Sequence, residues 1–230
     1  MIKLSQRGVL AAALLAAAVF PARAEQPLNT ILMGVGRSDF YVSSHDMTGP
    51  SGTTPAGIRT SASNKTIYVF AYDRRFDGPW SVTFEGGLPP VLRLQSGGTA
   101  AALGEIGTVR AWLPALLGTY TWESGRFAAH AGAGLHYTFF TDGFVNATYD
   151  GAFGGISNEV KFSSSLGPAL KVGTSWSLDR NWLIDLSYSK YWIRTTARAT
   201  TATPGLGNVE REIDLRARPA TVSLTAGYRF

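Results

Sequence analysis

Residues 160 to 176 alternate between two kinds of side chain. The even positions from Val160 to Trp176 are mostly large and apolar, whereas the odd positions hold Lys, Ser, Gly or Ala. A period of two is typical of a β-strand with one apolar face. Strands of soluble sheets usually span about 5–6 residues. At about 3.3 Å per residue, this segment would more than cross a bilayer core even when tilted. The pattern therefore favours a membrane-spanning strand.

The alternation recurs along the chain. It is clear in residues 80–85, 127–138, 184–189 and 221–230. Three further expected strands are residues 28–42, 65–75 and 108–122, where both faces carry apolar residues and the pattern does not fix the inward side. The sequence thus predicts eight strands.

The connections between these strands alternate in length. Short turns are expected at residues 75–79, 123–126 and 178–181, and long Gly-, Thr- and Ser-rich loops at residues 43–63, 88–107, 141–158 and 196–214. An even strand number with short turns at one end and long loops at the other is typical of outer-membrane barrels. We therefore expect an all-β fold, an eight-stranded antiparallel transmembrane β-barrel with both termini in the periplasm.

The N-terminus has the pattern of a secretory signal peptide. Lys3 and Arg7 precede an apolar stretch at residues 9–20, and Ala22-Arg23-Ala24 offers a small-x-small cleavage site. Twelve apolar residues are too few to span a bilayer as a helix. We expect residues 1–24 to be a signal peptide and residues 25–230 to be a single barrel domain. Removing the leader leaves 18 basic and 16 acidic residues, and no basic cluster indicates nucleic-acid binding.

Aromatic residues mark two further features. Four tryptophans lie near the expected short turns, and because Trp prefers the membrane interface they predict a periplasmic aromatic girdle. They are Trp80, Trp122, Trp176 and Trp182. The last strand carries Tyr228 and ends on Phe230. A terminal aromatic on an amphipathic strand is the signal that the outer-membrane assembly machinery recognises, so we expect this machinery as a partner.

Four stretches carry a resemblance to a known family, outer membrane protein W (OmpW). They are RAWLPALLGTY at 110–120, AGAGLHYTFF at 131–140, LDRNWLIDL at 178–186 and AGYRF at 226–230. The family usually has Asn at the place of His136 and a second Pro at the place of Ala115, which indicates a divergent member. The resemblance implies a narrow barrel in the outer membrane of a Gram-negative bacterium that passes small hydrophobic molecules by passive transport.

Polar residues on the expected inner face are the candidate functional residues. The candidates for lining or gating the lumen are Glu85, His130, His136, Lys161, Lys171 and Asp185, with Arg229 near the end of the chain. Charges inside a barrel are costly unless they are paired or wet. They form either a gate, in which Glu85 and Asp185 pair with Lys161, Lys171 or Arg229, or a structural plug. An eight-stranded barrel is only about wide enough for its own side chains, which excludes a wide pore.

Two other functional classes stay open. A non-conducting surface barrel would bind lipopolysaccharide, phage or host surfaces through its loops. A lipid A hydrolase would need His136 and Thr138 with Glu159, but the strand phase points His136 inward, and we expect no enzyme. The chain lacks cysteine and a tight histidine spacing, so no metal or cofactor is expected.

The expected loops hold two groups of residues with possible roles. Phe144, Tyr149, Phe153 and Leu206 would form either a hydrophobic vestibule or ordinary local packing. Arg194, Arg198, Arg211, Arg216 and Arg218 flank the last loop, where arginines would meet outer-membrane lipid and lipopolysaccharide phosphates without indicating a specific ligand.

Overall fold

A computed structural model describes residues 28–62, 65–76 and 78–230. The expected signal peptide, residues 1–24, lies outside the described residues. None of the helices in the described part is long and apolar enough to cross a membrane.

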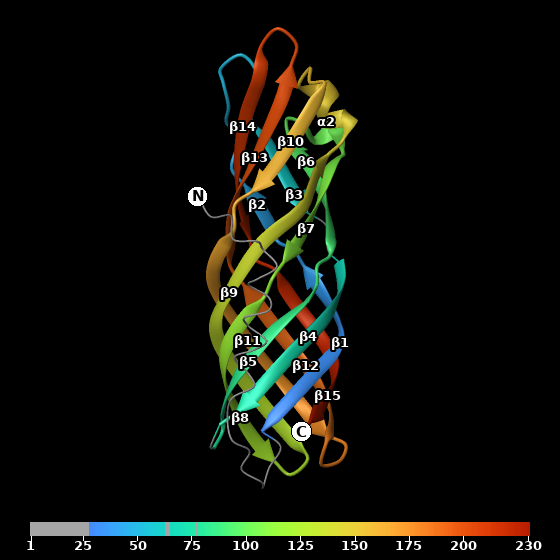
Figure 1. Ribbon diagram of the computed structural model, residues 1–230, viewed down its shortest axis with the longest axis vertical. Helices are drawn as coiled ribbons and strands as arrows, with labels where there is room; N and C mark the ends of the chain where they lie inside the picture. The colour runs from blue at the N-terminus through green and yellow to red at the C-terminus, as the bar shows by residue number, and fades with distance from the viewer. Residues whose placement is uncertain (1–27, 63–64, 77) are drawn as a thin grey trace, which may run out of the picture.

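Within the described residues, eight antiparallel strands close into a barrel (Figure 1). They are β1 (Asn29–Asp39), β4 (Lys65–Arg75), β5 (Trp80–Leu88), β8 (Ala115–Ser124), β9 (Phe127–Val145), β11 (Ser165–Ser177), β12 (Trp182–Tyr191) and β15 (Ala220–Arg229). The order runs β11-β12-β15-β1-β4-β5-β8-β9, and pairing between β9 and β11 closes the circle. The predicted fold class is confirmed.

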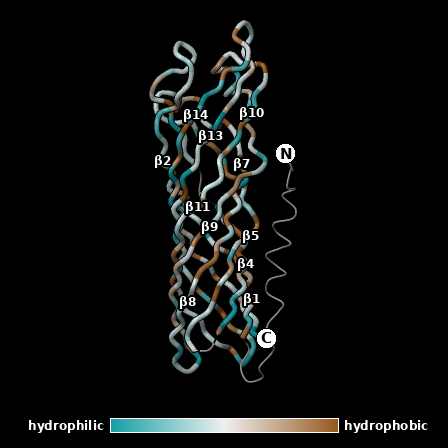
Figure 2. Tube along the Cα trace, turned by 60° about the vertical axis from the view of Figure 1, so that its left-hand side comes forward, coloured by the Kyte–Doolittle hydropathy of each residue, from teal (hydrophilic) through white to brown (hydrophobic). Residues whose placement is uncertain are grey.

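Side chains of these strands alternate between buried and exposed positions, and Figure 2 shows hydrophobic and hydrophilic residues interleaved along the barrel strands. On β11, Leu166, Leu170 and Val172 are exposed outward, whereas Ala169 and Lys171 are buried. The structure also fixes the strands whose phase the sequence left open. In β1 the side chains of Met33 and Val35 point outward and Ser38 is buried inside.

The barrel continues as a second tier beyond one end, which we call the loop end; the opposite end, with the short turns, is the turn end. This tier contains β2 (Val42–Ser44), β3 (Ile58–Ala62), β6 (Val91–Gly98), β7 (Glu105–Trp112), β10 (Ser157–Phe162), β13 (Ile193–Thr203) and β14 (Gly207–Ala217). A short helix, α2 (Ala147–Ala152), and a 3₁₀ turn, η1 (Ala101–Leu103), complete it. The four expected long connections lie in this tier, where much of their length pairs as strands.

A ring of strand breaks separates the two tiers. Prolines lie in several of these breaks: Pro89 and Pro90 between β5 and β6, Pro114 between β7 and β8, and Pro219 between β14 and β15. Proline has no N–H to donate to a ladder, so it ends regular pairing. Among the strands of the described residues, only β9 crosses the ring unbroken, over 19 residues.

The strand expected over residues 160–176 is also broken at this ring. Ser163 and Ser164 separate β10 from β11, and the Ser163 Oγ atom accepts a hydrogen bond from the Thr196 backbone N–H. The inward side changes from even residues, such as Phe162, to odd residues, beginning with Ser165. A single alternating pattern could not reveal this change of side.

The tight contact between β8 and β9 allows a test of the fold. A Cβ atom at Gly134 would clash with the backbone oxygen of Leu116, whereas one at Gly118 would have nothing nearer than 3.9 Å. We expect Gly134→Ala to destabilise the barrel by about 1–3 kcal/mol, because the backbones would have to separate. Gly118→Ala, the control, should fold normally. Heat-modifiable gel migration and urea unfolding measure both, and equal behaviour of the two variants would contradict this packing.

Candidate functional site

We call the closed barrel of eight strands the lower tier and the second tier beyond it the upper tier. The lower tier has a polar interior. Hydroxyl side chains fill much of it: Ser81, Thr83, Thr119, Ser187, Ser223 and Thr225 are all buried. Several of them bond across strands, as in the 2.8 Å contact between Thr83 and Thr119 and the 3.0 Å contact between Ser187 and Ser223. The interior is therefore filled by side chains, as expected for eight strands.

Glu85 is the centre of a buried cluster of polar and charged side chains in this interior. Its carboxylate accepts a hydrogen bond of 2.6 Å from Lys171 Nζ and one of 3.2 Å from Ser189 Oγ. The hydroxyl of Tyr191 donates a third, short hydrogen bond to the same carboxylate. All four residues are buried. We call Glu85, Lys171, Ser189 and Tyr191 the plug, because they join β5, β11 and β12 across the lumen.

A second hydrogen-bonded pair lies apart from the plug. His130 Nε2 is 2.7 Å from Asp185 Oδ2, so Asp185 pairs with a histidine rather than with one of the basic residues considered from the sequence. Arg229 instead donates to Ser177 Oγ at 3.0 Å. Asp73 on β4 accepts hydrogen bonds from Ser81 and Thr83. These groups continue the polar interior toward the turn end.

His136 is held inside the wall by two hydrogen bonds. Its Nε2 is 2.9 Å from the backbone oxygen of Trp192, and its Nδ1 is 3.0 Å from Thr138 Oγ1. The ring also meets Tyr191 edge to face at 6.0 Å. Since Nε2–H donates to a carbonyl, Nδ1 accepts the Thr138 proton. Glu159 lies elsewhere, paired with Lys161 at the surface, so the three residues do not form a hydrolase triad.

Lys161 does not line the lumen. Its side chain is 72% exposed and its Nζ is 2.9 Å from Glu159 Oε1. The expectation was wrong because β10 turns its even residues inward, so the neighbouring Val160 and Phe162 pack inside instead.

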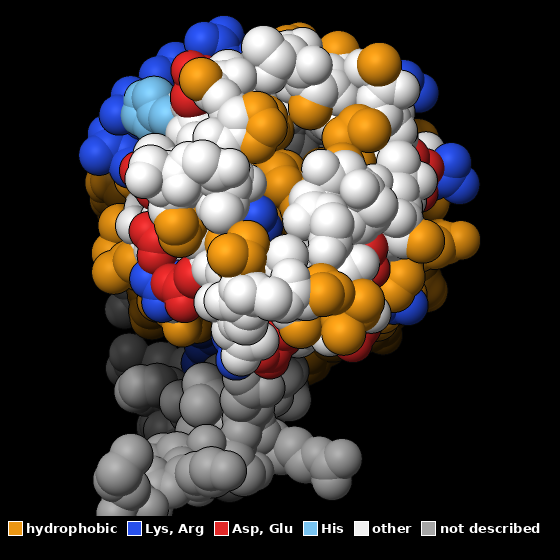
Figure 3. Space-filling view, turned by 90° about the horizontal axis from the view of Figure 1, so that it is seen from above, with side chains coloured by type: hydrophobic (Ala, Val, Ile, Leu, Met, Phe, Trp, Pro, Cys, Tyr) orange, Lys and Arg blue, Asp and Glu red, His pale blue; other side chains and the backbone are white. Residues whose placement is uncertain are grey.

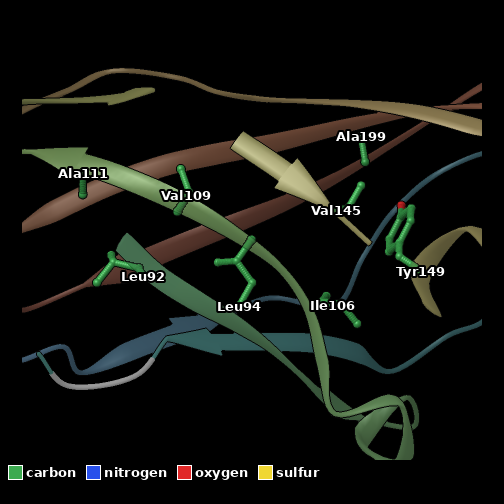
Figure 4. Close-up of a cluster of buried hydrophobic side chains, with 8 residues drawn as sticks. All are labelled: Leu92, Leu94, Ile106, Val109, Ala111, Val145, Tyr149 and Ala199. Atoms are coloured by element: carbon green, nitrogen blue, oxygen red, sulfur yellow. The ribbon is translucent and has the colours of Figure 1, made fainter. Parts of the chain in front are cut away.

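The interior of the upper tier is apolar. Figure 4 shows its central cluster, formed by Leu92, Leu94, Ile106, Val109, Ala111, Val145, Tyr149 and Ala199. Phe40, Phe140, Phe153, Val160 and Phe162 pack against it. We call this apolar interior of the upper tier the chamber. Of the expected vestibule residues, Tyr149 and Phe153 belong to it, whereas Phe144 and Leu206 are exposed. Seen from the loop end, hydrophobic side chains surround a hollow (Figure 3).

Arg211 connects several segments of the upper tier near the loop end. Its guanidinium donates to the Thr53 backbone oxygen at 2.9 Å and to Thr201 Oγ1 at 3.3 Å, and it lies 4.3 Å from the centre of the Phe153 ring. Burial raises the pKa of the adjacent Tyr149 phenol, and the Arg211 charge partly opposes that rise. This one side chain thus contacts the segment before β3 at Thr53, strand β13 at Thr201 and the segment after α2 at Phe153.

The wall has a gap at the ring of strand breaks. Pairing between β5 and β8 ends at Glu85 opposite Ala115, and pairing between β6 and β7 resumes only at Val91 opposite Arg110. A cavity of about 60 Å³ lies here. Its lining combines inward-facing Glu85 and Tyr191 with wall residues such as Leu88, which is exposed on the outer face. The cavity thus extends from the interior into the wall.

The tryptophans expected to form a girdle all lie on the outer face at the turn end. Trp80, Trp122, Trp176 and Trp182 are each between 49% and 56% exposed. Trp80 and Trp122 flank Tyr120 at 4.8 and 4.6 Å. Trp182 packs against Tyr228, which in turn contacts Phe230.

Sequence reasoning missed Tyr191 and Ser189 as parts of the plug. The expected strand ended at residue 189, yet the polar face of Asp185, Ser187 and Ser189 continues to Tyr191 in the same phase. Following the alternation two residues further would have placed this phenol inside the barrel.

The plug predicts an unequal response to removal of its two charges. Glu85→Leu leaves the Lys171 ammonium buried without a partner and should cost about 3–5 kcal/mol. Lys171→Leu should cost less, because Tyr191 and Ser189 still donate to Glu85. The double variant should recover part of the loss. Urea unfolding of the refolded protein measures the three values, and a Lys171→Leu variant less stable than Glu85→Leu would contradict this geometry.

Residues 92–230, more than half of the chain, match the profile of the OmpW family. Outer membrane protein W of Escherichia coli is 33% identical over 132 residues, which are 56% of this chain and 58% of that protein. The chain therefore spans about 58% of the length of that relative.

Two more similarities extend further along the chain. The dibenzothiophene metabolism operon protein PahQ of Pseudomonas aeruginosa is 23% identical over 181 residues, 78% of this chain and 79% of that protein. The crystal structure of OprG from the same species has a TM-score of 0.78 and 22% identity, covering 90% of this chain and 97% of that one. It has the same fold. The chain belongs to the OmpW family and is a β-barrel of the Gram-negative outer membrane.

Proposed function

We propose that this barrel is a passive channel for small hydrophobic molecules. The observation that carries the proposal is the apolar chamber of the upper tier, which gives such a molecule a favourable environment beyond the lipid. The resemblance to the OmpW family implies the same cargo class. The name of PahQ, which refers to dibenzothiophene metabolism, favours a small aromatic compound.

The proposed path leaves the chamber sideways. Straight passage to the turn end would require the solute to displace the plug and cross an interior of hydroxyl and charged groups. The side cavity between Gly86 and Leu113 lies at the floor of the chamber, at the gap in the wall. At about 60 Å³ it is smaller than the roughly 150 Å³ cavity that accepts benzene. The strands at the gap must therefore separate for a solute to pass.

The orientation and export route are part of the same proposal. The loop end faces the outside medium and the turn end faces the periplasm, where the four tryptophans act as a girdle. Residues 1–24 direct export, and Tyr228 and Phe230 serve as the recognition signal for the assembly machinery. Whole cells with a single cysteine introduced at Leu206, labelled by an impermeant maleimide, test the orientation.

The second candidate is a non-conducting surface barrel. The filled lower lumen and the Arg211 contacts that connect segments near the loop end favour it. Uptake decides between the two. Cells carrying the barrel should take up naphthalene faster than cells without it, with no change for a polar sugar. Equal naphthalene uptake by both would reject the channel.

Substitution of Arg211 tests whether solutes enter the barrel through the loop end. Arg211→Ala should increase naphthalene uptake several-fold if entry limits the rate, because the loops at Thr53 and Phe153 lose their common contact. The control, Arg93→Ala, removes an outward-facing arginine whose pair with Glu105 is exposed, and it should leave uptake unchanged. An Arg211→Ala barrel that folds but takes up naphthalene more slowly than wild type would argue against entry through the loop end.

A disulfide across the wall gap tests the exit. The natural chain has no cysteine, and a Cβ atom at position 86 would lie 3.9 Å from the Cα atom of Pro114, so cysteines introduced at these two positions would be close neighbours. The Gly86→Cys/Pro114→Cys variant should lose most naphthalene uptake when oxidised and regain it on reduction. Each single cysteine variant serves as the control and should not respond to reductant. Uptake that is unaffected by oxidation would exclude the side exit.

A further inference from the structure

The lipid-facing surface of β12 ends abruptly at a basic residue. Ile184, Leu186 and Tyr188 point outward and are between 42% and 51% exposed. The next outward residue is Lys190, whose Nζ lies 5.3 Å from the centre of the exposed Tyr41 ring. From Trp182 to Lys190 the strand has nine residues, which matches the roughly 9–11 residues of a membrane-spanning strand. Lys190 therefore lies at the outer border of the lipid zone.

Three arginines continue from Lys190 on the same outer face. Arg194 on β13 and Arg216 on β14 are direct cross-strand partners, and both side chains are exposed. Arg218 is exposed between β14 and β15, with its backbone N–H bonded to the Tyr41 oxygen. We call Lys190, Arg194, Arg216 and Arg218 the basic column. Figure 3 shows Lys and Arg side chains gathered on one sector of the rim.

Carboxylates of the described residues do not neutralise the column. The two nearby acids have other partners: Asp39 lies 3.8 Å from Arg37, and Asp214 accepts a hydrogen bond of 2.6 Å from Thr196. Among the described residues, no side chain forms an ion pair with any member of the column. Like charges directly opposite each other on a sheet are destabilising, so Arg194 and Arg216 carry an uncompensated cost.

Elsewhere on the same pair of strands, β13 and β14, an arginine lies opposite an acidic residue, and the repulsion between like charges is avoided. Arg198 lies four residues beyond Arg194 on the outward face of β13, and its Nε is 2.9 Å from Glu210 and 2.6 Å from Glu212. On the outward face of β13 and β14, the arginines without an acidic partner thus lie at the border of the lipid zone, whereas Arg198 beyond it is paired. Arginine and lysine at such a border suit phosphate groups, since guanidinium forms two parallel hydrogen bonds to a phosphate.

We infer that the basic column binds the phosphate groups of lipid A, the lipopolysaccharide anchor. Its acyl chains would lie along the apolar outer faces of β12 and β15, and its phosphates would lie between Arg194 and Arg216 and beside Lys190 and Arg218. The bound phosphate removes the repulsion between the two opposed arginines. This inference rests on the orientation proposed above and not on transport.

Lipid binding to the purified full-length barrel tests the inference. Native mass spectrometry from a non-ionic detergent measures the affinity for bisphosphorylated lipid A, dephosphorylated lipid A and phosphatidylglycerol. Wild type should prefer bisphosphorylated lipid A, with an affinity that falls as salt rises. Arg194→Gln/Arg216→Gln should bind it about tenfold more weakly, because two charge-assisted contacts are lost. The control, Arg59→Gln/Arg93→Gln, removes two exposed arginines that have acidic partners and should bind as wild type.

Every outcome of this experiment either supports the lipid A inference or contradicts it. Equal binding of dephosphorylated lipid A or of phosphatidylglycerol by wild type would overturn the inference, as would an equal loss in the control. If the double variant fails to show heat-modifiable migration, Arg218→Gln replaces it, with the same expected direction. Since binding in detergent needs no transport, failure here leaves the uptake experiment unaffected.

Discussion

Eight strands enclose a space about as wide as the side chains that point into it. Every inward residue of the lower tier must therefore pack against, or bond to, a residue from across the barrel. Glu85 meets this constraint for three strands at once, because Lys171, Ser189 and Tyr191 all donate to its carboxylate. The same contacts that satisfy buried charges also fill the lumen. Under the transport function proposed above, a solute would avoid this route and use the wall gap above the plug.

The barrel and its lipid-facing alternation could be predicted from the sequence because a period of two survives wherever one face meets lipid and the other meets side chains. The pairing of Glu85 with Lys171 could be narrowed to a few options, since both lie on inward positions of regular strands. The sequence could not show whether Lys171 or Lys161 is the partner of Glu85. The answer depends on the change of the inward side at Ser163 and Ser164, where hydrogen bonds to a distant strand replace the ladder.

The upper tier was beyond sequence reasoning for a related reason. Its strands carry residues that are also common in loops: β13 is rich in Thr, and β14 begins with Gly and Asn and is rich in charged residues. Pairing of β13 with β14 over eleven residues makes them strands. The role of Arg211 has the same origin, because its contacts with Thr53 and Phe153 join segments far apart in the chain. No local pattern marks one arginine among several as buried.

Polarity inverts across the ring of strand breaks. Below it, the outer face is apolar and the interior carries Glu85 and Lys171; above it, the interior is apolar, and Arg194 and Lys161 face outward. The apolar interior of the upper tier and the lipid around the lower tier thus lie on opposite sides of the barrel wall, at neighbouring heights along the barrel axis. The shortest path that stays apolar crosses the wall at this ring, where Pro89 and Pro114 interrupt the hydrogen-bond ladder. Opening a gap there costs few backbone hydrogen bonds, because the ladder between these strands is already missing.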